Sequence, residues 1–70
     1  MNTEIKEIAN TLFSRHLFNE IDSEGITKEV LTLEKHLQLP VILTLLKMFE
    51  DYRTSLEIMK EITEFQTTTH

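Results

Sequence analysis

Residues 40–65 read PVILTLLKMFEDYRTSLEIMKEITEF, and this uninterrupted stretch decides the fold. Pro40 suits the first turn of a helix, because the amide hydrogen that proline lacks has no intrahelical acceptor there. No glycine and no further proline follows, so we expect a helix from Pro40 to about Phe65. At 1.5 Å per residue this helix is roughly 39 Å long, whereas a compact chain of this length has a radius of gyration of roughly 11 Å. The helix is therefore longer than the body to which it belongs.

Apolar residues recur along this helix at alternating spacings of three and four, which is typical of a coiled-coil seam. Its first half is also apolar on other faces, and a helix that is apolar all round must be surrounded. Residues 41–49 could be covered by the rest of the chain as the centre of a three-helix core. We favour a protein interface, because two short helices cover only part of the circumference. The predicted interface residues are Ile42, Leu45, Leu46, Phe49, Tyr52, Leu56 and Met59.

Two shorter helices are expected before Pro40. The first is an amphipathic helix that begins at Asn2 or Thr3 as its N-cap and ends or bends near Phe18, since apolar residues from Ile5 to Leu17 share one side of a helical wheel. The second carries a stripe of Val30, Leu33 and Leu37.

The segment between these two helices contains Gly25, the only glycine of the chain. We expect Gly25 to form the turn with a positive φ, and Thr27 to be the N-cap of the second helix. Leu39 is expected to be non-helical, because the residue before a proline avoids the α region.

The chain has 70 residues, which allow one domain, and we assign it to residues 1–66, followed by a disordered polar tail over residues 67–70. A domain of this size buries only about 60% of the surface that its unfolded chain exposes. Cysteine is absent, so disulfides and thiolate metal sites cannot stabilise the fold. Burial of apolar surface against a partner chain is the remaining way to stabilise so small a domain. This predicts a homo-oligomer, most simply a dimer.

The formal net charge of −5 argues against a nucleic-acid partner or an anionic membrane surface, because phosphate binding depends on Lys and Arg. No apolar run is long enough to span a bilayer. The first ten residues are polar and acidic, unlike a signal peptide, so we expect a cytoplasmic protein. The abundance of Ile, Lys, Glu and Thr fits a bacterial or phage source.

The sequence lacks the patterns that carry catalysis, and we predict no catalytic, cofactor-binding or metal-binding residue. The histidines, His16, His36 and His70, have no spacing that brings two of them to one metal ion, and no Glu-x-x-His motif occurs. No glycine-rich loop or serine elbow is present. His16 lies within the apolar stripe of the first helix, which favours a neutral, hydrogen-bonded core histidine over the alternative of a ligand or acid–base role.

Residues 33–41, LEKHLQLPV, resemble the first helix and turn of a helix-turn-helix motif. The resemblance implies DNA binding by the helix that follows, but that helix offers Ile42, Leu43, Leu45 and Leu46 where Arg, Asn or Gln would contact bases. A third hypothesis is an acidic mimic of nucleic acid that uses Glu50, Asp51, Glu57, Glu61 and Glu64.

The sequence therefore predicts an all-α protein in which two shorter helices pack on one long C-terminal helix, completed by oligomerisation. The expected function is that of a non-enzymatic, self-associating protein-interaction module, such as a regulator, an inhibitor or an assembly subunit.

Overall fold

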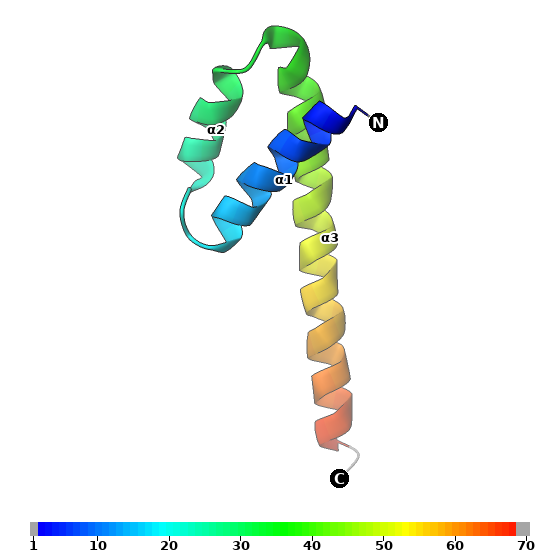
Figure 1. The fold of residues 1–70 in the computed structure, drawn as a ribbon. Helices are drawn as coiled ribbons and strands as arrows, with labels where there is room; N and C mark the ends of the chain where they lie inside the picture. Colours follow the sequence, from blue (N-terminus) through cyan, green and yellow to red (C-terminus); the bar gives the residue numbers. More distant parts are fainter. Residues whose placement is uncertain (1, 69–70) are drawn as a thin grey trace.

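The computed structural model of the protein describes the backbone of residues 2–68 and the side chains of residues 2–66, and this part of the chain forms three helices and no strand. The helices are α1 (Thr3–Leu17), α2 (Ser23–Leu31) and α3 (Lys35–Thr68). Figure 1 shows α1 and α2 as a hairpin beside the first half of α3, while the second half extends away from the hairpin. The predicted all-α architecture, with two shorter helices packed on a long third one, is confirmed.

The molecule is elongated, with principal dimensions of 55 × 26 × 14 Å and a Cα radius of gyration of 15.7 Å. Because α3 contains 34 residues, it is about 51 Å long at 1.5 Å per residue and accounts for nearly the whole long dimension. This confirms the expectation that the third helix is longer than a compact domain of 70 residues is wide.

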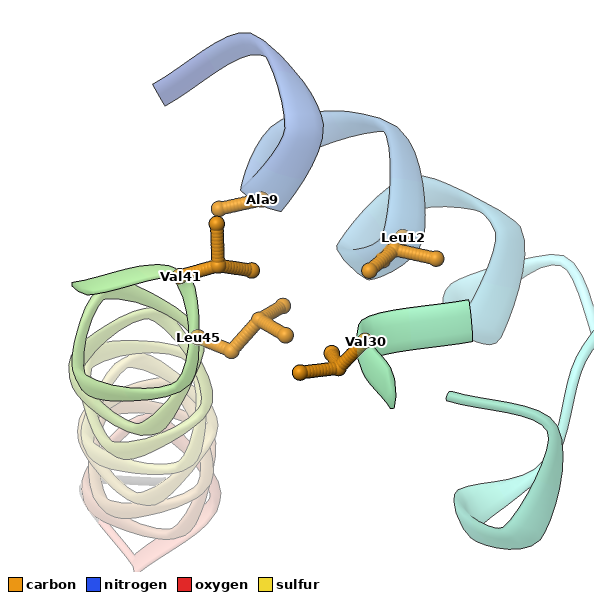
Figure 2. Packing of buried hydrophobic residues seen from close by; sticks show 5 residues of the cluster. All are labelled: Ala9, Leu12, Val30, Val41 and Leu45. Carbon is orange, nitrogen blue, oxygen red and sulfur yellow. The ribbon is translucent and has the colours of Figure 1, made fainter. Parts of the chain in front are cut away.

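A small apolar core joins the three helices. Ala9 and Leu12 come from α1, Val30 from α2, and Val41 and Leu45 from α3, and Figure 2 shows their side chains pointing toward one another. All five are at most 4% exposed. Burial of an aliphatic side chain stabilises a fold by about 1.5–3 kcal/mol, so this cluster is the main source of stability in the hairpin region.

The caps of α1 follow from local chemistry. The Asn2 side-chain oxygen accepts a hydrogen bond from the Glu4 amide at 2.8 Å, which confirms Asn2 as the N-cap. α1 ends at Leu17, and the chain then reverses through Asn19, which has φ 60°. Asparagine tolerates this left-handed conformation better than most residues. Asn19, and not Gly25, therefore provides the positive φ between the first two helices.

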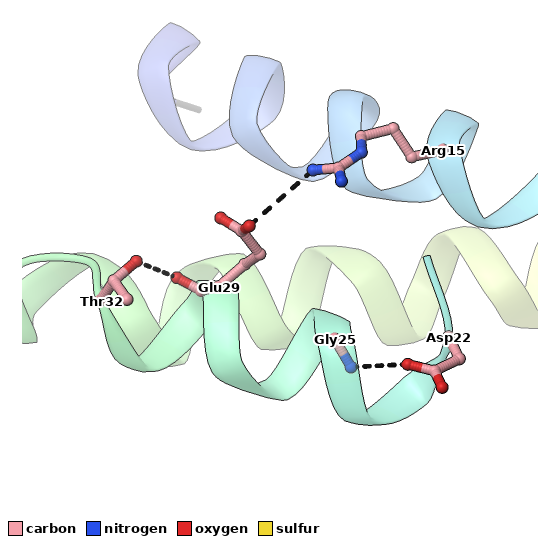
Figure 3. A network of polar contacts seen from close by, with 5 residues as sticks. All are labelled: Arg15, Asp22, Gly25, Glu29 and Thr32. Carbon is pink, nitrogen blue, oxygen red and sulfur yellow. Dashed lines mark hydrogen bonds and ion pairs between the residues drawn. The ribbon is translucent and has the colours of Figure 1, made fainter. Parts of the chain in front are cut away.

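The predicted roles of Gly25 and Thr27 are wrong. Gly25 is helical, without a positive φ, and α2 begins earlier, with Asp22 as its N-cap. The Asp22 carboxylate accepts a hydrogen bond from the Gly25 amide at 2.8 Å (Figure 3). The Thr27 hydroxyl instead donates to the Ser23 carbonyl at 2.9 Å, one turn back within the helix. Asp22 takes precedence as the cap because its carboxylate meets an amide of the first turn.

Glycine is required at position 25 because Ile21 leaves no space there for a side chain. A Cβ atom added at this position would lie 2.6 Å from Cγ1 of Ile21, which is closer than nonbonded carbon atoms approach. Ile21 is half-buried and packs on the core. The absence of a side chain at Gly25 therefore lets Ile21 cover the start of α2.

The start of the third helix also differs from the prediction. α3 begins at Lys35, so Leu39 is helical, Pro40 lies inside the helix, and Leu37 belongs to α3 and not to the second helix. Leu33 lies in the loop before α3. The extra turn buries Leu37, which is 5% exposed.

Proline inside a helix removes one backbone hydrogen bond, here the bond to the His36 carbonyl. His36 is exposed, so water can reach the region of that carbonyl. The Gln38 side chain also ties this turn to the preceding loop by donating to the Leu33 carbonyl at 3.0 Å. Tertiary burial and this side-chain bond thus outweigh the local preference against helix before Pro40.

The predicted tail is only partly described. α3 continues through Thr67 and Thr68, which the sequence had assigned to the disordered tail, and residues 69 and 70 lie outside the described part of the chain.

The Asp22 cap leads to a first prediction. Asp22→Ala removes the acceptor for the Gly25 amide and should lower the free energy of unfolding by about 1 kcal/mol. Thr27→Ala removes only a bond from the hydroxyl to a carbonyl within the helix and should change it by less than about 0.5 kcal/mol. Urea denaturation of both variants measures the difference. A larger loss for Thr27→Ala would contradict the assignment of Asp22 as the cap.

The contact at Gly25 leads to a second prediction. Gly25→Ala should destabilise the protein, although alanine is the better helix former by about 1 kcal/mol, because its Cβ meets Ile21. In an Ile21→Ala background the contacts with Cγ1 and Cδ1 of Ile21 are gone and the milder approach to Asp22 Oδ1, at 3.2 Å, remains, so the same Gly25→Ala change should become stabilising. A double-mutant cycle measured by urea denaturation tests this reversal of sign. Equal effects in both backgrounds would show that Ile21 is not the reason for glycine.

Candidate functional site

The hairpin contacts α3 through a cluster of aromatic rings. The ring of Phe13 lies 4.9 Å from that of Phe49 and 6.0 Å from that of Tyr52, both in edge-on arrangements. Edge-to-face pairs contribute about 0.5–1.5 kcal/mol beyond the area that they bury. Tyr52 is the last of these contacts along α3, and it is already 41% exposed. The aromatic cluster therefore marks the end of the region that the hairpin covers.

His16 belongs to this cluster and has a structural role. Its ring stands edge-on to Phe49 at 5.2 Å, and its Nδ1 atom lies 3.0 Å from the Ile21 carbonyl oxygen. A carbonyl oxygen only accepts hydrogen bonds, so Nδ1 carries the proton and donates it. The bond ties the end of α1 to the segment that leads into α2. His16 thus occupies a half-buried position with a hydrogen bond, as the sequence indicated.

An apolar groove lies between α2 and α3, with a volume of about 410 Å³. Leu45 and Val30, both 4% exposed, form part of its lining and belong to the core. His16, Ser23 and Thr27 contribute the few polar atoms. The remaining lining side chains, which are apolar, are Ile26, Leu31, Ile42, Leu46 and Phe49.

The second half of α3, residues 50–68, is called the projecting segment below. Every side chain from Glu50 to Gln66 is exposed, and Figure 1 shows neither α1 nor α2 beside most of this segment. Large apolar side chains lie along one side of it, and we call them the projecting apolar face: Tyr52, Leu56, Ile58, Met59, Ile62 and Phe65, which are between 41% and 69% exposed.

The opposite side of the projecting segment is charged. At 100° per residue, Arg53, Lys60 and the glutamates fall away from the projecting apolar face. The segment is therefore amphipathic, as is usual for a helix that packs on one side against other apolar surface. The charged residues of this side are Glu50, Arg53, Glu57, Lys60, Glu61 and Glu64.

The structure distributes the seven predicted interface residues over three environments. Leu45 lies in the core of the hairpin region. Ile42, Leu46 and Phe49 line the groove, where Phe49 is half-buried and Leu46 is 60% exposed. The other three belong to the projecting apolar face and are Tyr52, Leu56 and Met59.

Sequence reasoning missed part of both surfaces. Ile58, Ile62 and Phe65 extend the projecting apolar face, and their spacing of four and three was a signal that could have added them. The wall of the groove on α2 had no comparable signal, because Ile26 and Leu31 meet α3 only through the fold.

Ion pairs contribute little to the packing of the three helices. Arg15 and Glu29 link α1 to α2 at 3.9 Å (Figure 3), and Lys47 pairs with Asp51 at 3.7 Å along α3. Such exposed pairs contribute about 0–1 kcal/mol each. The apolar contacts, not the charges, therefore fix the position of α3 against the hairpin.

No group of three or more His, Asp or Glu side chains in the described range is arranged to hold a metal ion. Nor does any helix, over residues 2–68, contain a stretch with the length and hydropathy needed to cross a membrane. The notable features of the described surface are thus the groove and the projecting apolar face.

Comparisons of the chain with protein-family models, with curated proteins and with solved structures gave no match. The residues and the geometry described above are therefore the basis for assigning a function.

Proposed function

We propose that this protein is a non-enzymatic helical interaction module that binds a second copy of itself through α3, and that it acts as a regulator, an inhibitor or an assembly subunit. The observation that carries the proposal is the projecting apolar face, a row of exposed large apolar side chains on a helix that the hairpin leaves uncovered.

Packing against a partner would stabilise the projecting segment. Helices shorter than about 12–15 residues are marginal in water, and most helical stability in proteins comes from packing of the apolar face. The projecting segment is not much longer than that limit, its side chains from Glu50 to Gln66 are exposed, and Tyr52, at its start, contacts Phe13 of the hairpin. Association with another apolar helix face would supply further packing.

The size of the exposed apolar surface suits an interface between proteins. Aromatic side chains have areas of roughly 150–250 Å², and two of the six side chains of the projecting apolar face are aromatic, so the six half-exposed side chains present at most on the order of 600 Å². A standard interface buries about 800 Å² on each partner. The projecting apolar face together with the exposed lining of the groove reaches that size, whereas scattered single apolar residues would not.

A DNA-binding role gains no support from the surface of α3. Its first half exposes Leu39, Ile42, Leu43 and Leu46, none of which can hydrogen-bond to base edges. Lys47 is paired with Asp51. The acidic-mimic hypothesis has no observation in its favour either, because Arg53 and Lys60 interrupt the acidic side of the projecting segment.

The proposal predicts that the protein sediments as a dimer or higher oligomer at micromolar concentration. Leu56→Glu should weaken association by more than about tenfold, because it would bury a charge without a counter-charge. Leu56 is a better site than Phe49 for this test, since Phe49 also packs on Phe13 within the chain. Glu61→Lys, on the charged side of the same segment, is the matched control and should leave association unchanged. Sedimentation of the unmodified protein as an 8.3 kDa monomer would refute the proposal.

Self-association also predicts that helicity depends on concentration. On dilution below the dissociation constant, the projecting segment should lose helix, because its apolar face is no longer covered. Circular dichroism at 222 nm, measured over a dilution series, should show a loss for the unmodified protein. Leu56→Glu should show the reduced signal throughout the series. An unchanged signal per residue in the monomer would mean that the helix is stable alone.

A further inference from the structure

We draw no further inference here: the strongest candidate, the apolar groove of about 410 Å³ between α2 and α3, carries none because nothing in the described part of the chain shows what covers it.

Discussion

The hairpin of α1 and α2 covers α3 only as far as Tyr52, and the rest of the molecule depends on this mismatch in length. A helix of 34 residues cannot be buried by helices of 15 and 9 residues that pack on its first half. The first half gains a core through Val41 and Leu45. Beyond Tyr52 the second half repeats the apolar pattern with exposed side chains as far as Gln66, and this surface is the basis for the proposed self-association.

The aromatic cluster stands at the boundary between these two halves. Phe49 packs on Phe13 and His16 within the chain and also lines the groove. Stability of the hairpin region and recognition of a second copy would therefore share one side chain. Substitution of Phe49 would change both, whereas Leu56 and Met59, which are exposed in the single chain, report on association alone.

The small core links stability to concentration. Few side chains are fully buried, and the ion pairs on the surface are exposed and weak. A partner that binds only the folded chain stabilises it by mass action. If the protein self-associates as proposed, its melting temperature rises with protein concentration, and the limited core of the single chain is no obstacle to a well-folded assembly.

The sequence by itself determined the helical class, an N-cap at Asn2 or Thr3, the approximate end of α1 and the long third helix, because these follow from local periodicity, capping chemistry and the absence of glycine and proline. The apolar seam from Ile42 to Met59 was equally readable. Only the tertiary structure decided that Leu45 belongs to the core and that Leu46 and Ile42 face a groove, since that depends on where α2 packs. It also decided that α3 starts at Lys35: burial of Leu37 outweighs the local bias against helix before Pro40. Position 25 likewise needs glycine because the Ile21 side chain lies where a Cβ atom would be. The conformational preference of a single residue does not reveal such a contact.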